Sequence, residues 1–260
     1  MKMSPISRLA IFFAALGITL ASPVRRDLAP GPEFVRLDKS EALVIVADLQ
    51  EGLYKTVRDY NTIEYRNNMI AHAAIAKLFD IPIVLTTSAE HGPNGILPKE
   101  ISGLYPDAPL IRRNGEVDAW DNPDFRNAVK AQNKTQVILG GITTDVCTEF
   151  LALSLRSEGY TVFANTEASG TFSDKLAADA NRRMEGGGVI LQGVFAIVMD
   201  LMRDWRNTPG SAQVLPWLDT YLPSYGYVAR TADSEFFYSA HEAAVLNGTL
   251  APGEEGLKRK

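Results

Sequence analysis

The sequence has one cysteine and three histidines in 260 residues, and this scarcity excludes several kinds of site. A single cysteine cannot form an internal disulfide, so packing of the core alone must stabilise the fold. No two histidines stand at the spacing of metal ligands, which gives no support for a zinc site or a related metal site. We therefore expect neither a metal nor any other cofactor.

Other missing patterns narrow the function further. No Gly-x-Ser-x-Gly segment is present, which argues against a serine hydrolase of the α/β-hydrolase type. The run Gly186-Gly187-Gly188 lacks the strand-then-helix context of a dinucleotide-binding loop. The formal net charge of −5 gives no indication of a nucleic-acid partner. The classes that remain open are chemistry on a small molecule and contacts with other proteins.

The first 22 residues have the pattern of a secretory signal peptide. Lys2 and Arg8 give a basic start, residues 9–20 are apolar, and Ala21-Ser22 supplies small residues. The apolar run of about 12 residues is shorter than the roughly 20 that a membrane-spanning helix needs, so no stable membrane association is expected. A signal anchor is the alternative. Residues 23–33 are interpreted as a linker or propeptide, in which Arg25-Arg26 is a candidate processing site.

If the protein is secreted, two asparagines become candidate glycosylation sites. Asn133 and Asn247 each begin an Asn-x-Thr triplet, although such triplets also arise by chance. The predicted location is therefore extracellular.

From residue 34 onward, short apolar segments alternate with patterns of helical spacing. Strands are predicted at 42–48, 81–88, 108–113, 135–141, 160–165 and 188–193, and helices at 64–79, 123–132, 148–159, 174–187 and 194–205. Apolar strands separated by helices indicate a parallel sheet that is covered on both faces. We predict a three-layer, Rossmann-like, doubly wound α/β domain over residues 34–230, followed by a C-terminal tail at 231–260.

Three residues that can carry chemistry follow or end predicted strands. In such sheets ligands bind beyond the carboxyl ends of the strands, where Asp48, Arg113 and Cys147 fall. A thiol at a helix N-terminus is favoured as thiolate, and the backbone N–H groups there can bind an oxyanion. From position alone, however, Cys147 can equally be a small core residue, Asp48 a turn residue and Arg113 an exposed strand end.

A resemblance to a known family adds to this interpretation. The segments "VIVADLQEGL", "AWDNPDF" and "ILGGITTDVCTEFLALSLRSEGYTVFANTEASGTF" resemble the isochorismatase-like cysteine hydrolases, in particular the YcaC-like branch. The resemblance implies an Asp–Lys–Cys triad on a Rossmann-like sheet, with Asp48 and Cys147 at the first and last positions. It also implies a non-proline cis peptide at Ile142-Thr143, which would shape an oxyanion hole with the backbone N–H of Cys147. Relatives in the family assemble into homo-oligomers.

The lysine of the triad is where this sequence departs from the family pattern. Arg113 matches that position, but Arg112 is adjacent, and on a strand the two point to opposite faces. Arginine stays protonated and cannot transfer a proton as a lysine with a perturbed pKa can. It can still stabilise a thiolate and orient Asp48.

The combined hypothesis is a secreted cysteine hydrolase that cleaves a small amide-type substrate through a thioester. Trp120, His91 and Phe172 are candidate substrate-binding residues, with a packing role as the alternative for Trp120. Three other functions stay open. One is a non-catalytic secreted binding or effector protein, the second is an isochorismate-type vinyl-ether hydrolase, and the third is redox sensing by Cys147.

Overall fold

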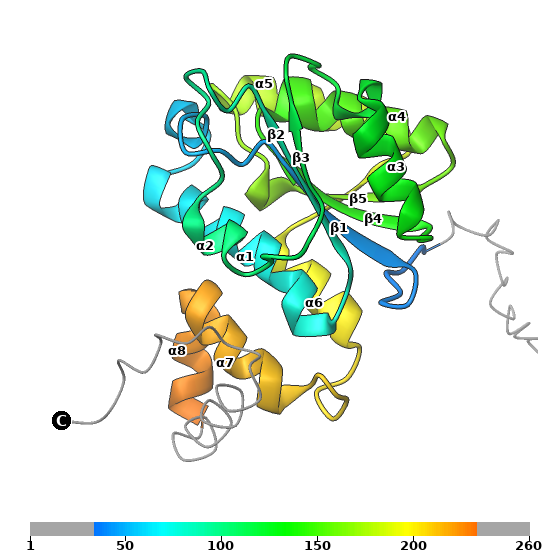
Figure 1. The fold of residues 1–260 in the computed structure, drawn as a ribbon. Coiled ribbons are helices and arrows are strands. Elements are labelled where there is room, and N and C mark those ends of the chain that lie inside the picture. The colour runs from blue at the N-terminus through cyan, green and yellow to red at the C-terminus, as the bar shows by residue number, and fades with distance from the viewer. Residues whose placement is uncertain (1–33, 233–260) are drawn as a thin grey trace, which may run out of the picture. The chain divides into compact units, whose positions relative to one another are not determined.

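Six parallel strands form the central sheet of the computed structural model, which describes residues 34–232 (Figure 1). Their order is β3-β2-β1-β4-β5-β6, so the chain winds outward from β1 in both directions. The strands are β1 Ala42–Ala47, β2 Ile83–Ser88, β3 Leu110–Arg113, β4 Gln136–Gly141, β5 Thr161–Asn165 and β6 Ile190–Gln192. The predicted doubly wound α/β fold is confirmed. The predicted signal peptide, the linker, Asn247 and nearly all of the tail lie outside the described residues.

Apolar residues on both faces of the strands explain why the sheet is buried. In β1, Leu43, Ile45 and Ala47 belong to one core cluster. The alternate residues of the same strand, such as Val44, belong to the other. A strand whose side chains are apolar on both faces needs a layer of helices on each side.

Helices supply those two layers (Figure 1). Residues of α1 and α6 pack in the first cluster and residues of α3, α4 and α5 in the second. None of the helices within residues 34–232 is long and apolar enough to cross a membrane. The bounds are α1 Thr62–Phe79, α2 Lys99–Ser102, α3 Pro123–Ala131, α4 Glu149–Ser157, α5 Asp174–Gly186, α6 Val194–Met202, α7 Ser211–Tyr221 and α8 Pro223–Ala232.

Side-chain caps fix where several helices begin. The side chain of Asn122 accepts a hydrogen bond from the N–H of Phe125 at 3.0 Å, and Pro123 occupies the first helical position of α3. Asn61 caps α1 in the same way, through the N–H of Ile63 at 3.0 Å. Such caps satisfy N–H groups that have no partner within the helix.

The structure differs from the sequence-based expectation in three places. The short helix α2 and the C-terminal pair α7 and α8 were not predicted, and Pro216 inside α7 is a residue that ordinarily argues against a helix. The helix predicted to reach residue 205 ends at Met202, because Arg203 takes a positive φ of 67°. The helix predicted at 148–159 begins at Glu149 and is preceded by a π-helical turn, Thr144–Thr148.

His72 is a fully buried histidine of α1 that joins the helix to the sheet. Its Nε2 lies 3.0 Å from the carbonyl oxygen of Ile45, and its Nδ1 lies 3.2 Å from the side-chain amide nitrogen of Asn165. These partners suit a neutral ring that donates from Nε2 and accepts at Nδ1. A Cβ atom at Gly140 would lie 2.9 Å from the ring, so the close packing requires glycine there.

Burial lowers the pKa of His72 to about 4 from an ordinary value near 6.5. The unfolded chain therefore takes up a proton on His72 more readily than the folded protein between these two pH values. We expect the free energy of unfolding to decrease as pH falls from about 6.5 to 4. Urea unfolding at pH 7 and pH 5 measures this change, which should be smaller in His72→Gln. An equal pH dependence in His72→Gln and in the loop control His91→Gln would contradict it.

Candidate active site

Asp48 lies at the carboxyl end of β1, where the strand turns sharply. Its N–H still continues the sheet by donating to the carbonyl of Thr86 at 3.0 Å, and its carbonyl accepts from the N–H of Gln50 at 2.7 Å. The turn gives Asp48 a φ of 59°, a conformation that aspartate tolerates better than most residues. The side chain is completely buried, so its carboxylate needs a charged or hydrogen-bonding partner.

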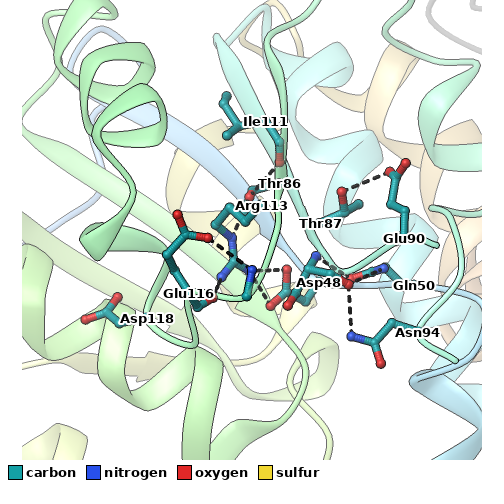
Figure 2. A network of polar contacts seen from close by, with 12 residues as sticks. Asp48, Gln50, Thr86, Thr87, Glu90, Asn94, Ile111, Arg113, Glu116 and Asp118 are labelled. Carbon is teal, nitrogen blue, oxygen red and sulfur yellow. Dashed lines mark hydrogen bonds and ion pairs between the residues drawn. The ribbon is translucent and has the colours of Figure 1, made fainter. Parts of the chain in front are cut away.

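Arg113 is that partner, and each of the three nitrogens of its guanidinium donates a hydrogen bond (Figure 2). Nη2 donates to both carboxylate oxygens of Asp48. Nε donates to Oγ1 of Thr86 at 3.0 Å, and Nη1 donates to the carbonyl of Glu116. Both side chains of the ion pair are fully buried. Because removing either partner would leave a buried charge unpaired, the two groups hold each other in place.

The neighbouring Arg112 points away from this site. In the register of β2 and β3, Thr87 faces Arg112 and Ser88 faces Arg113. The Arg112 side chain is exposed and donates to Glu90 at 2.9 Å. Of the two arginines considered from the sequence, Arg113 is therefore the one that contacts Asp48.

Cys147 lies within the π-helical turn between β4 and α4, next to the same carboxylate. The thiol is hydrogen-bonded to Asp48, and the backbone of Thr143 contributes a hydrogen bond to the sulfur. The peptide bond between Ile142 and Thr143 is cis, at the position that the family resemblance implies. The side chain of Asp145 anchors the turn by accepting from Oγ1 of Thr171 at 2.6 Å. The structure thus brings Asp48, Arg113 and Cys147 together.

The electrostatics differ from the expectation based on a helix N-terminus. Burial raises the pKa of the Cys147 thiol to about 12, the charge of Asp48 and its hydrogen bond raise it further, and Arg113 opposes this. Burial also raises the pKa of Asp48, again opposed by Arg113. This direction is opposite to the thiolate that a helix N-terminus favours. We infer that the unreacted pair holds its proton on sulfur, next to the Asp48 carboxylate that can accept it.

The three candidate substrate-binding residues have different surroundings. Trp120 is buried in the second core cluster, with its ring centroid 6.3 Å from that of Phe125 and 6.0 Å from that of Tyr160, so its contacts are those of a packing residue. His91 is exposed in the loop after β2. Phe172 is 52% exposed and follows Thr171, the residue that anchors the turn of Cys147. A substrate-binding role for His91 and Phe172 stays a prediction.

Several residues that build the site were not identified from the sequence. The hydroxyl of Thr86 donates a hydrogen bond to the carbonyl of Ile111 at 2.9 Å while accepting one from Arg113. Gln50, within the quoted segment "VIVADLQEGL", is completely buried and hydrogen-bonds the end of β2. The only signal for Gln50 in the sequence was its place as a polar residue two positions after the predicted strand at 42–48.

The described residues also bear on metal and glycan sites. Within 34–232, no three side chains of histidine, cysteine, aspartate or glutamate gather as metal ligands would. Asn133 is exposed just after α3 and has a φ of 50°.

Comparison with known proteins identifies relatives of the whole domain. The profile described as the isochorismatase domain matches residues 41–201. The Probable hydrolase YcaC of Escherichia coli is 42% identical over 201 residues, which cover 77% of this chain and 96% of that protein. The crystal structure of the Escherichia coli YcaC gene product, an octameric hydrolase of unknown specificity, has a TM-score of 0.74 at 42% identity and covers 78% of this chain and 99% of its own.

A second solved structure is comparably similar. YcaC from Pseudomonas aeruginosa, with hexane-2,5-diol and covalent acrylamide, has a TM-score of 0.72 at 43% identity and covers 76% of this chain and 98% of its own.

Replacing the buried carboxylate tests the electrostatic account. In Asp48→Asn we expect the pKa of Cys147 to fall well below its wild-type value of about 12, because the carboxylate that raises it is gone while Arg113 remains. Alkylation by iodoacetamide across pH measures this directly, since Cys147 is the only cysteine. Asp145→Asn is the matched control within the same turn, because the amide oxygen of asparagine can still accept the hydrogen bond from Thr171 that anchors the turn. An unchanged or higher midpoint in Asp48→Asn would contradict the account.

Proposed function

The chain belongs to the isochorismatase family, in its YcaC-like branch, and from this premise we propose that it is a cysteine-dependent hydrolase of small amides. The observation that carries the proposal is the thiol of Cys147 hydrogen-bonded to a buried carboxylate that is itself paired with Arg113. A nucleophile beside a base that a third group orients is the arrangement that covalent catalysis requires.

In the first half of the proposed reaction, Asp48 accepts the thiol proton as the sulfur attacks the carbonyl carbon. The electrons of the C=O bond move to oxygen, and backbone N–H groups of Thr143 and Cys147 are proposed to stabilise this oxyanion. When the tetrahedral intermediate collapses, the C–N bond breaks and the proton on Asp48 passes to the leaving amine. The product on the enzyme is a thioester.

In the second half, water replaces the amine. Asp48 accepts a proton from the water as its oxygen attacks the thioester carbonyl. Collapse of the second intermediate breaks the C–S bond, releases the carboxylic acid and returns the proton from Asp48 to the sulfur. A carboxylate whose pKa is raised by burial is a better proton acceptor than an exposed one, which suits both halves.

Arg113 takes the position of the family lysine without acting as a proton carrier. Its Nη2 contacts both oxygens of Asp48 while Nε and Nη1 bond Thr86 and Glu116, and a single ammonium group cannot make all of these contacts in the same arrangement. We propose that it orients Asp48 and lowers the energy of the thiolate as the thiolate forms.

The amide class is supported by chemistry, because thiolates that attack carbonyl groups form thioesters readily. The Pseudomonas aeruginosa relative contains covalent acrylamide, an electrophile that adds to nucleophiles through its C=C bond, so that relative supports a reactive nucleophile and not the amide class. Isochorismate-type vinyl-ether hydrolysis is the runner-up, since it does not require the thiol.

We further propose that the protein is secreted, glycosylated at Asn133 and Asn247, and homo-oligomeric. Secretion and the second glycan rest on the sequence of the N-terminal segment and the Asn-x-Thr triplets, and the exposure of Asn133 suits a glycan. The octameric Escherichia coli relative supports assembly of copies of this chain.

Replacing the nucleophile tests the reaction. Cys147→Ala is expected to abolish hydrolysis of the amides that the wild type cleaves, and Asp48→Asn to reduce it by roughly 100- to 10,000-fold, the usual range for a lost general base. Mass spectrometry of rapidly quenched wild type should detect an acyl group on Cys147. Hydrolysis of isochorismate by an otherwise inactive Cys147→Ala would support the runner-up, and full amide hydrolysis by Cys147→Ala would contradict the thioester pathway.

Substitutions of Arg113 separate the effect of its positive charge from the effect of its hydrogen-bond geometry. Arg113→Lys keeps the positive charge and should retain measurable turnover. Arg113→Met leaves Asp48 buried without an ionic partner, and should lose turnover and about 3–5 kcal/mol of unfolding free energy. Turnover assays and urea unfolding measure both effects, with the exposed Arg112→Met as matched control. Wild-type activity in Arg113→Met would contradict the role of the ion pair.

A further inference from the structure

Beyond the end of β1, the side chain of Gln50 makes hydrogen bonds to β2 in place of the main chain. The N–H of Asp48 donates to the carbonyl of Thr86, and beyond Asp48 the backbone turns away from β2. The Oε1 atom of Gln50 then accepts from the N–H of Ser88 at 2.8 Å, and Nε2 donates to the carbonyl of Ser88 at 3.0 Å. One side-chain amide thus satisfies both main-chain groups that Ser88 directs toward β1.

The same amide holds the loop that follows β2. Nε2 of Gln50 also donates to the carbonyl of Gly95, and Asn94 donates to the carbonyl of Ser88 at 2.9 Å (Figure 2). Next to Gln50, the N–H of Gly52 donates to the carbonyl of Asn94 at 2.9 Å. A Cβ atom at Gly52 would lie 1.9 Å from the carbonyl oxygen of Pro93, so the loop lies directly against this backbone.

These contacts connect Gln50 to both members of the buried ion pair. Asp48 is joined to it through the tight turn in which the N–H of Gln50 donates to the carbonyl of Asp48 at 2.7 Å. Arg113 is joined to it through Ser88, because Ser88 faces Arg113 in the register of β2 and β3. Since Gln50 is completely buried, a residue without these donors would leave buried carbonyl groups unpaired.

We propose that Gln50 is a positioning residue that holds Asp48 against Cys147 and seats the loop at 89–96, which carries His91. Among the described contacts, the Gln50 amide is the direct link between Ser88 and the turn of Asp48, and an indirect link runs through Asn94 and Gly52. Removing the amide therefore loosens the turn and shifts the carboxylate relative to the sulfur, although the ion pair with Arg113 remains. The effect on turnover rests on the proposed function, whereas the effect on the contact between Asp48 and Cys147 does not.

The test compares Gln50→Met with a matched control at the opposite, amino-terminal ends of the strands. Gln136 begins β4, and its side chain likewise bonds two main-chain groups, both in the segment 36–38: it accepts from the N–H of Asp38 at 2.7 Å and donates to the carbonyl of Arg36 at 2.9 Å. Gln136→Met therefore removes a similar clamp far from Cys147 along the strands. Both variants are made in the full chain and compared by thermal unfolding.

The decisive readout is the pH midpoint of iodoacetamide alkylation at Cys147. In Gln50→Met it should fall toward the midpoint of Asp48→Asn, because the carboxylate no longer faces the thiol, while Gln136→Met should keep the wild-type midpoint at similar loss of melting temperature. On an amide that the wild type cleaves, kcat should fall roughly 10- to 100-fold, as expected when reacting groups are misplaced.

A wild-type midpoint and wild-type kcat in folded Gln50→Met would overturn the proposal. If that variant does not fold, Gln50→Asn, which is one methylene too short to reach Ser88, is measured in the same way and decides by the same criteria. If the wild type cleaves no amide, the proposed function fails, and the alkylation midpoint still decides whether Gln50 positions Asp48.

Discussion

The buried ion pair between Asp48 and Arg113 is the interaction on which the rest of the site depends. Two charges without access to water are costly unless they satisfy each other, so the structure around them is arranged to keep both in place. Thr86 and the carbonyl of Glu116 accept hydrogen bonds from the other two guanidinium nitrogens, and the turn after β1 directs the carboxylate toward Cys147. The fold contributes the carboxyl ends of β3, β1 and β4, which belong to four neighbouring strands in the order β3-β2-β1-β4, and these groups meet there.

The pair also determines the resting state of the nucleophile. Burial and the neighbouring carboxylate both favour the protonated thiol, which protects the chain's only cysteine from reagents that react with thiolates. In the proposed mechanism, activation requires transfer of the proton to Asp48 at the moment of attack, when Arg113 can stabilise the charge that appears on sulfur. In this account the family's lysine and the arginine of this chain share an electrostatic role, although they differ in how many contacts they can make at once.

The architecture could be predicted from the sequence because it follows from periodicity. Apolar segments separated by helical patterns predicted the parallel sheet. The position of Asp48, Arg113 and Cys147 at the ends of predicted strands then placed all three at the carboxyl ends of that sheet. The state of the thiol could not be predicted in the same way. It depends on how deeply Cys147 is buried and on its distance from a carboxylate about a hundred residues earlier, and neither is visible as a pattern. The π-helical turn was missed because its five residues resemble the start of an ordinary helix. Gln50 was missed because a side chain that pairs with a strand leaves no periodic signal.

The protonation state of Cys147 at neutral pH tests this account most directly. Labelling cysteine with ¹³C at Cβ produces one signal, since the chain has a single cysteine, and its chemical shift distinguishes thiol from thiolate. The account predicts a thiol at pH 7 in the wild type, with the change to thiolate moving to lower pH in Asp48→Asn. A thiolate signal at pH 7 in the unmodified wild-type protein would contradict the central claim that Asp48 holds the nucleophile in its protonated form until it reacts.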